Sequence, residues 1–398
     1  MQVKEWKDAL SALGARVGER WAPRFPDENA FAEIASDELE AAGFEGGFDA
    51  LTEALLSSDP LPKQINPDGT FGQPSVTAFR GDCFVIEVLY WLDGLVSIHQ
   101  HGFSGAFGVL SGSSVHCRYR FREQSRVHAG MLLGRLELSS AEFLRPGQVR
   151  RIDSGPALIH STFHLERPTV TLVVRTQAAR ENGPQYDYRP PSLAIDPFHR
   201  PPTLEKRLQI LRMLARCRPA LYFRSVRSLL EHTDLFAAYR ILDQGFLLSE
   251  DVADRERLVA LARAVHGDRL GPLVPVLEES AKRRALVAWR DRETDDEVRL
   301  LFALLLNVPD RRTVFELLSL RYPEETSERV VLRCLKKLGI DEPSLVLGRI
   351  LLGGAPDRDE LRARLARENV RYKNDFEMLA SARALREAPG LERLFAAK

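Results

Sequence analysis

The spacing of hydrophobic residues changes along this chain and divides it into stretches of different character. Residues 1 to about 60 carry apolar positions three and four apart, as in WKDALSALGARVGERW and FDALTEALLSS. That spacing puts the apolar side chains on one face of a helix. From Val76 to about Gln177, apolar residues instead form short runs rich in β-branched and aromatic types, separated by glycine or proline. Such runs are typical of an antiparallel barrel or sandwich.

Two further stretches complete the pattern. Residues 178–202 are polar and rich in proline and tyrosine, and we interpret them as a linker or a wrapping segment. After Thr203 the helical spacing returns and continues to the end, with roughly ten helices expected and no convincing repeat period. We therefore predict an α+β multidomain chain. Its expected parts are an N-terminal helical segment (1–60), a central antiparallel β-barrel (76–177), a linker (178–202) and an all-α domain, either a stack or a degenerate repeat (203–398).

Composition narrows the function classes. Lysine plus arginine and aspartate plus glutamate number 56 each, so no basic excess suggests a nucleic-acid partner. The longest apolar run, Leu300 to Val308, is far shorter than the roughly 20 residues of a membrane span. The N-terminus lacks the apolar core of a secretory signal, and the four cysteines show no CxxC pairing. We expect a cytoplasmic protein with reduced thiols that binds neither nucleic acid nor membrane.

Histidines are paired on two of the predicted strands. His99 and His101 stand in SIHQH, and His160 and His164 stand in ALIHSTFHL with Thr162 between them. Side chains two apart in a strand point to the same face, and a closed barrel could bring the two strands face to face inside its mouth. Imidazoles side by side in apolar surroundings cost desolvation energy unless something pairs them. We therefore predict that His99, His101 and His160 bind a metal ion and leave coordination positions open.

Other polar residues are assigned different roles. His164 could be a direct ligand, but we favour a role in orienting a ligand or contacting substrate. Arg175 should point into the barrel, where a buried cation needs an anionic partner, either a substrate carboxylate or a nearby acidic residue. Trp91 is expected to pack beneath the site, and Arg118 and Tyr119 to lie on an ordinary sheet surface. The remaining histidines are interpreted as ordinary core or surface residues: His116, His128, His199, His232 and His266.

The two histidine segments resemble the motifs of the cupin superfamily. The residues of the first motif are Gly94, His99, His101 and Gly112, and those of the second are Gly155, Pro156 and His160, with His164 where the family has asparagine. The carboxylate ligand of the first motif is missing, its position falling near Gly105 or Ala106. A site of three histidines resembles the thiol dioxygenase branch, cysteine dioxygenase and its relatives, and YWLDGLVSIHQH is similar to that branch. The resemblance covers about residues 76–177.

This resemblance implies a cupin barrel, dioxygen as a co-substrate and an Fe(II) centre, although three imidazoles also suit Zn, Mn or Ni. Arg80 corresponds to the arginine that binds the substrate carboxylate in that branch. On the last strand, Thr171, Val173 and Arg175 replace the Ser-His-Tyr triad of the vertebrate enzymes, and the cross-linking cysteine is also replaced. The resemblance therefore implies a substrate other than free cysteine. The candidate catalytic residues are Arg80, Arg175 and His164.

Three hypotheses for function follow. The first is an Fe(II)-dependent cupin oxygenase, dioxygenase-like, that acts on a small thiol, an amino-acid-like molecule or a peptide. The second is a catalytically degenerate cupin that serves as a binding or scaffold protein through its helices. The third is an isomerase or hydrolase that uses another divalent metal. Residues 203–398 carry no recognisable chemistry, and we expect them to bind a protein partner, to form a homodimer or to cover the barrel mouth.

Overall fold

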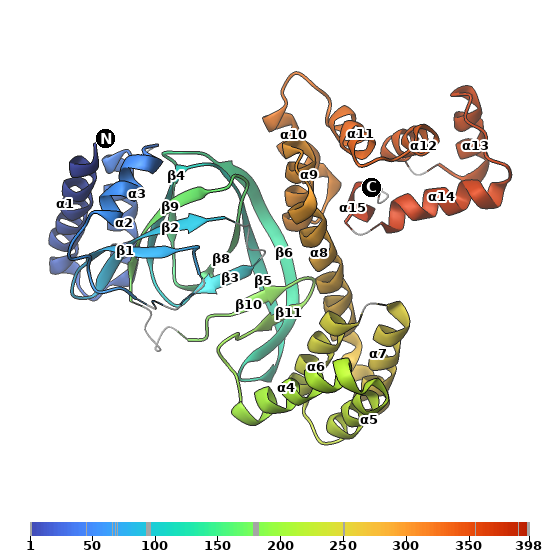
Figure 1. The fold of residues 1–398 in the computed structure, drawn as a ribbon, viewed down its shortest axis with the longest axis horizontal. Coiled ribbons are helices and arrows are strands. Elements are labelled where there is room, and N and C mark those ends of the chain that lie inside the picture. Colours follow the sequence, from blue (N-terminus) through green and yellow to red (C-terminus); the bar gives the residue numbers. More distant parts are fainter. Residues whose placement is uncertain are drawn as a thin grey trace.

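The computed structural model describes residues 2–44, 46–65, 67, 69, 71–92, 97–177, 183–249, 251–354, 356–388 and 390–395. N-terminal helices lie against one side of a β structure, and a large helical region lies against the other side (Figure 1). The β structure contains a closed antiparallel barrel. The predicted fold class is therefore confirmed.

The N-terminal helices cover the outer face of a five-stranded sheet. They are α1 (Val3–Trp21), the 3-10 turn η1 (Ala22–Arg24), α2 (Glu28–Ala42) and α3 (Phe48–Leu56). The strands, in spatial order, are β1 (Ser75–Arg80), β2 (Phe84–Trp91), β9 (Thr169–Thr176), β4 (Gly105–Ser111) and β7 (Val149–Ile152). The alternation of side chains assigns the faces: Ile86 and Val88 pack with the helices, whereas Leu89 and Trp91 belong to a separate inner cluster. Both faces of β2 are therefore buried.

The second sheet closes on itself. Its strands, in spatial order, are β10 (Asp187–Arg189), β11 (Leu193–Ile195), β6 (Met131–Leu144), β5 (Ser114–His128), β8 (Gly155–His164) and β3 (Ile98–His101). Pairing between β10 and β3 completes the ring. Two strands lie within residues 178–202, which we interpreted as a linker or a wrapping segment. Each has three residues, too few to produce a recognisable alternation, although Tyr188 is buried.

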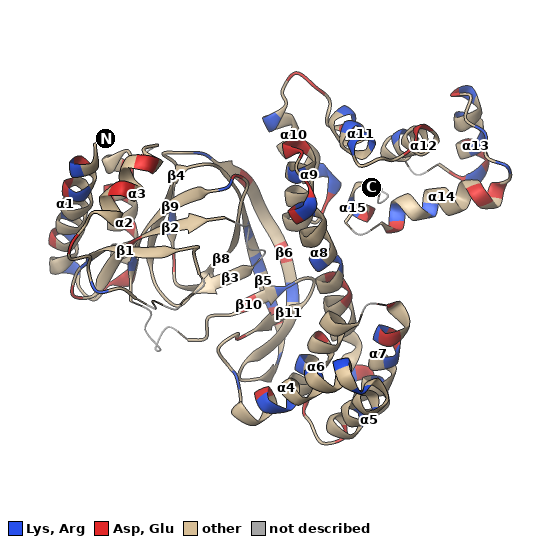
Figure 2. Cartoon of the chain, viewed as in Figure 1, with Lys and Arg blue, Asp and Glu red and all other residues tan. Residues whose placement is uncertain are grey.

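The C-terminal half is helical throughout its described parts. The helices are α4 (Pro202–Cys217), α5 (Pro219–Leu230), α6 (Leu235–Leu248), α7 (Val252–His266), η3 (Gly267–Leu273), α8 (Val274–Arg292), α9 (Asp296–Asn307), α10 (Arg311–Arg321), α11 (Ser327–Lys337), α12 (Glu342–Leu352), α13 (Arg358–Arg367), α14 (Asp375–Glu387) and α15 (Glu392–Phe395). Many begin at an aspartate whose side chain accepts backbone N–H groups, for example Asp234, Asp295 and Asp357. Figure 2 shows acidic and basic residues intermingled along these helices. Among the described residues, no helix has the length and apolar character needed to cross a membrane.

Helix α9 packs against the outside of the second sheet, and this corrects one prediction. Tyr119 on β5 was expected on an ordinary sheet surface, but it is 8% exposed and its hydroxyl donates to the Asn307 carbonyl oxygen at 2.8 Å. Arg118 is exposed, as expected. The periodicity of β5 could not reveal that its outer face carries a helix, because that contact joins residues 188 positions apart.

Candidate metal centre

A cavity of about 870 Å³ lies inside the β structure. It is lined by side chains from both sheets, including Trp91 and Arg175 from the first and His101 and His160 from the second. Its described lining residues all precede Pro202, so no described residue of the C-terminal helices lines it. A mostly apolar cavity with a few convergent polar groups is the usual form of a small-molecule site.

Three of the predicted residues converge in this cavity. The side chains of His99, His101 and His160 each offer a ligand nitrogen, and these atoms all lie within 4.8 Å of one another. The ring centroids are 4.6 Å apart for His99 and His101, and 5.0 Å apart for each of the other two pairs. The structure thus brings together the three histidines that the sequence assigns to a metal.

The route by which they meet differs from the expected one. We predicted two strands facing each other across the barrel mouth, but β3 and β8 are hydrogen-bonded neighbours, with His99 directly opposite His160. A register shift lies between His99 and His101, and His101 pairs with Gly155 on β8. Directly opposite residues in antiparallel strands have Cβ atoms about 5 Å apart, so neighbouring strands suffice to assemble the cluster.

The donor set fits a divalent metal ion. The Nε2 atoms of His101 and His160 are 2.8 Å apart. Two imidazole nitrogens that each bind one ion at about 2.0–2.1 Å, at right angles, would be about 3 Å apart. Burial lowers the pKa of His99 and lowers the pKa of His101 and His160 well below the usual value. The imidazoles are therefore neutral near pH 7, and their lone pairs are available to a metal.

His164 lies in the same cavity but outside the cluster of three. Its Nδ1 is 2.9 Å from the Ser114 hydroxyl, and its ring stacks on Trp91 with centroids 4.4 Å apart. Trp91 in turn donates to the Thr171 hydroxyl at 2.9 Å. Burial lowers the pKa of His164 to about 3, so this ring is also neutral. The contacts of His164 match a residue beside the centre rather than a member of it.

The two candidate arginines differ in their surroundings. Arg175 points into the cavity, where its Nε donates to Glu87 at 2.6 Å and its guanidinium lies over the Phe103 ring. Of the two partners considered for Arg175, the structure contains the acidic residue. Arg80 is exposed at the cavity and donates to the Lys63 carbonyl oxygen at 3.4 Å. It forms no ion pair with the residues that the structure describes.

The local backbone explains why glycine is found at several positions in and near the two motifs. Gly112 and Gly155 both have positive φ, +77° and +67°, which favours glycine at these two positions. Gly105 lies so close to β9 that a Cβ would be 2.0 Å from the Val174 carbonyl oxygen. Any side chain there would therefore clash with the backbone of β9. Gly94 lies outside the described residues.

Sequence reasoning missed several residues near the cluster. His116, interpreted as an ordinary histidine, has Nε2 3.1 Å from His160 Nδ1, and its other nitrogen lies 3.0 Å from Glu142. Asp187, in the stretch predicted as a linker, lines the cavity on β10 directly opposite His99. The two-residue spacing of His116 and Arg118 puts both on one face of β5, but a sequence does not show which partner strands lie beside that face.

Comparison with known proteins adds little. No protein-family model and no curated protein matches the chain. Among solved structures, it is similar to a chain described under crystal structures of the DMSP lyases RdDddP and RnDddQII, at 16% identity. The match covers 44% of this chain and 95% of that chain, with a TM-score of 0.25. With a TM-score that low, neither fold nor activity is inferred from the match.

The class of the protein rests instead on its own geometry. An antiparallel barrel that carries a histidine pair on one strand and a third histidine on its neighbour fits a cupin. The cluster could hold a metal ion.

Proposed function

We propose that this chain is a metal-dependent cupin enzyme, an Fe(II) oxygenase that resembles the thiol dioxygenases and acts on a small thiol, an amino-acid-like molecule or a peptide. The observation that carries the proposal is the set of three neutral imidazoles converging within 4.8 Å at a cavity wall. Three neutral ligands would leave a bound ion its full charge, so that it could lower the pKa of a substrate thiol and accept dioxygen beside it.

The residues around the centre would select and orient the substrate. Arg80 has no acidic partner among the described residues and would attract an anionic group at the cavity opening. The Thr162 hydroxyl is buried between His160 and His164 and has no described hydrogen-bond partner. An unsatisfied buried hydroxyl costs about 1–3 kcal/mol, which a hydrogen bond from substrate would offset. Arg175 and Glu87 would together form a polar part of the cavity wall, in which the charge of each offsets that of the other.

The size of the cavity favours a substrate larger than free cysteine. Sites of about 300–1,000 Å³ commonly enclose drug-sized ligands, and this cavity has about 870 Å³. Phe103, Phe107 and Val173 supply apolar surface around the histidines. A substrate with an apolar portion and one anionic group would match both the lining and Arg80.

Metal analysis of anaerobically purified protein tests the proposal. We expect about one iron per chain, since three protein ligands define one site. His99→Ala should remove most of the metal while the protein stays folded by circular dichroism. His232→Ala, which changes an exposed histidine far from the cavity in sequence, is the matched control and should keep the metal.

Oxygen consumption tests the reaction type. The iron-loaded protein should consume dioxygen with at least one member of a panel of thiols, amino acids and thiol-containing peptides, and Arg80→Met should raise the KM for anionic members. Tightly bound zinc, manganese or nickel without oxygen consumption would favour an isomerase or hydrolase. A folded protein that binds no divalent metal would contradict the proposal and favour a catalytically degenerate cupin that acts as a binding or scaffold protein through its helices.

A further inference from the structure

A line of polar contacts extends from the candidate metal centre through the barrel wall. His160 Nδ1 lies 3.1 Å from His116 Nε2, and His116 Nδ1 lies 3.0 Å from Glu142 Oε1. Arg150 donates from Nε to the same carboxylate at 2.8 Å and from Nη2 to its second oxygen. The line therefore has an arginine at the outside and a cluster histidine at the inside.

The sheet register builds this line. His116 on β5 is directly opposite Glu142 on β6, so their side chains share one face. On its other side, β5 pairs with β8, which carries His160. The His116 side chain is 1% exposed, whereas that of Glu142 is 37% exposed. The His116 imidazole is thus enclosed in the wall and reaches both the cavity side and the partly exposed carboxylate.

The hydrogen bonds in this line can all run outward, with each histidine donating toward the glutamate. Arg150 hydrogen bonding, with that of His116, holds the pKa of Glu142 at about 2, so the carboxylate only accepts near pH 7. His116 Nδ1 must then carry the hydrogen, which leaves Nε2 of this neutral imidazole as an acceptor. His160 Nδ1 therefore donates, and the lone pair of His160 lies on Nε2, the atom that is 2.8 Å from His101 Nε2.

We propose that His116 and Glu142 are positioning residues that fix the tautomer and ring orientation of His160 for metal binding. The inference rests on the proposed metal centre and assigns to it an outer layer that reaches the protein surface. Partners of this kind behind a ligating histidine commonly change metal affinity by about 10–100-fold.

The three histidines are not held alike. His101 Nδ1 is buried and has no hydrogen-bond partner among the described residues, and His99 Nδ1 lies 3.4 Å from the Ser97 carbonyl oxygen. Within the described part of the chain, His160 is thus the one of the three histidines whose Nδ1 is connected through a second histidine to a carboxylate. Loss of that line should affect one ligand and leave the other two in place.

Cobalt(II) binding to the metal-free full chain tests this inference. We expect His116→Phe to weaken Co(II) affinity by about 10–100-fold in competition with a chromophoric chelator, and to change the visible absorption of the bound ion. Glu142→Gln should weaken it in the same direction, although Glu142 does not line the cavity. A purely structural role would lower the melting temperature of the metal-free protein and leave both readouts unchanged.

Glu137→Gln is the matched control. Glu137 lies on β6 like Glu142, is 29% exposed and pairs with Arg122 and Arg135, but takes no part in the line of contacts to His160. It should keep near-normal Co(II) affinity. A loss equal to that of His116→Phe would overturn the inference, as would unchanged affinity in both His116→Phe and Glu142→Gln. Should His116→Phe fail to fold, Glu142→Gln decides alone, because its site is partly exposed.

His160→Ala separates this inference from the proposed function. If His160→Ala abolishes Co(II) binding while the two outer variants do not change it, the positioning role fails and the metal centre stands. If His160→Ala leaves Co(II) binding intact, the metal centre itself fails, and the positioning role fails with it.

Discussion

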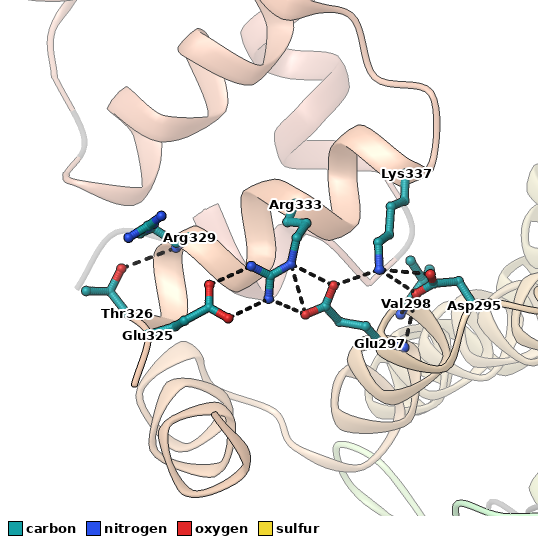
Figure 3. A network of polar contacts seen from close by, with 8 residues as sticks. All are labelled: Asp295, Glu297, Val298, Glu325, Thr326, Arg329, Arg333 and Lys337. Carbon is teal, nitrogen blue, oxygen red and sulfur yellow. Dashed lines mark hydrogen bonds and ion pairs between the residues drawn. The ribbon is translucent and has the colours of Figure 1, made fainter. Parts of the chain in front are cut away.

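Two glutamates, one in the barrel and one in the helical region, each accept hydrogen bonds from more than one basic side chain. Glu142 binds Arg150 and His116. Glu297 on α9 binds Arg333 and Lys337 on α11, and these two cations also reach Glu325 and Asp295 (Figure 3). In both places the hydrogen bonds from cations lower the pKa of the carboxyl group.

The difference lies in where each network ends. The two cations that bind Glu297 are about one-third exposed, Arg333 at 38% and Lys337 at 37%, and their further partners are also acidic side chains. It joins two helices, and none of its described members lines the cavity of the candidate metal centre. The network of Glu142 ends at the enclosed His116, whose second nitrogen faces the cluster. Pairing of a glutamate with basic side chains therefore joins two helices in one region and reaches a candidate site in the other. The difference is His116, which contacts both Glu142 and His160.

The largest difference between the two regions should be in metal affinity. His160→Ala removes one of three proposed ligands, so we expect a loss greater than the roughly 100-fold that outer partners can produce. Arg333→Met, in the helical network, should leave metal affinity unchanged. Equilibrium dialysis followed by elemental analysis measures both variants, and an equal loss in the two would contradict the separation of roles.

The free energy of unfolding should change when the helical network is altered, although this effect is smaller than the loss of metal affinity. Arg333→Met removes the hydrogen bonds to Glu297, and we expect the free energy of unfolding to fall by about 1 kcal/mol or less, since the pair is partly exposed. Urea unfolding followed by circular dichroism measures the change. High salt should reduce the difference between variant and parent, because exposed charges are screened. A salt-independent loss of several kcal/mol would show that Arg333 acts through packing.

The smallest expected effect is in the pH dependence of stability. The folded-state pKa of Glu142, about 2, lies below the usual value of about 4.3 for an unfolded chain. The folded protein thus binds fewer protons between these values, and the contribution is complete above about pH 4.3 and lost as pH falls toward 2. The stability difference between Glu142→Gln and the parent, about 1 kcal/mol or less because the group is over one-third exposed, should shrink as pH falls from 5 to 3. A constant difference would contradict this.

Sequence parity predicted the faces of the histidine strands well. His160 and His164 point into the cavity, whereas Ile159 and Phe163 pack in the core shared with the helices. The two-residue period of a strand fixes this arrangement locally. Parity also indicated that Arg175 points inward, as it does.

Partnerships between strands could not be predicted in the same way. The pairing of His99 with His160 and of His116 with Glu142 depends on register, which local periodicity does not specify. The short β10 was hidden by its proline- and tyrosine-rich surroundings, and with it the position of Asp187. The residues most informative about the outer layer of the site were therefore those that required the tertiary structure.

The pairing of β10 with β3 has a practical consequence for dissecting the molecule. A shortened chain that stops at residue 177, the limit expected for the barrel, would keep all three clustered histidines but lose the neighbour of Ile98 and His99. Their backbone N–H and C=O groups would then be unpaired on an exposed edge strand, which favours aggregation with other chains. Any minimal version intended for metal titration should thus extend at least through Ile195, where the last small strand ends.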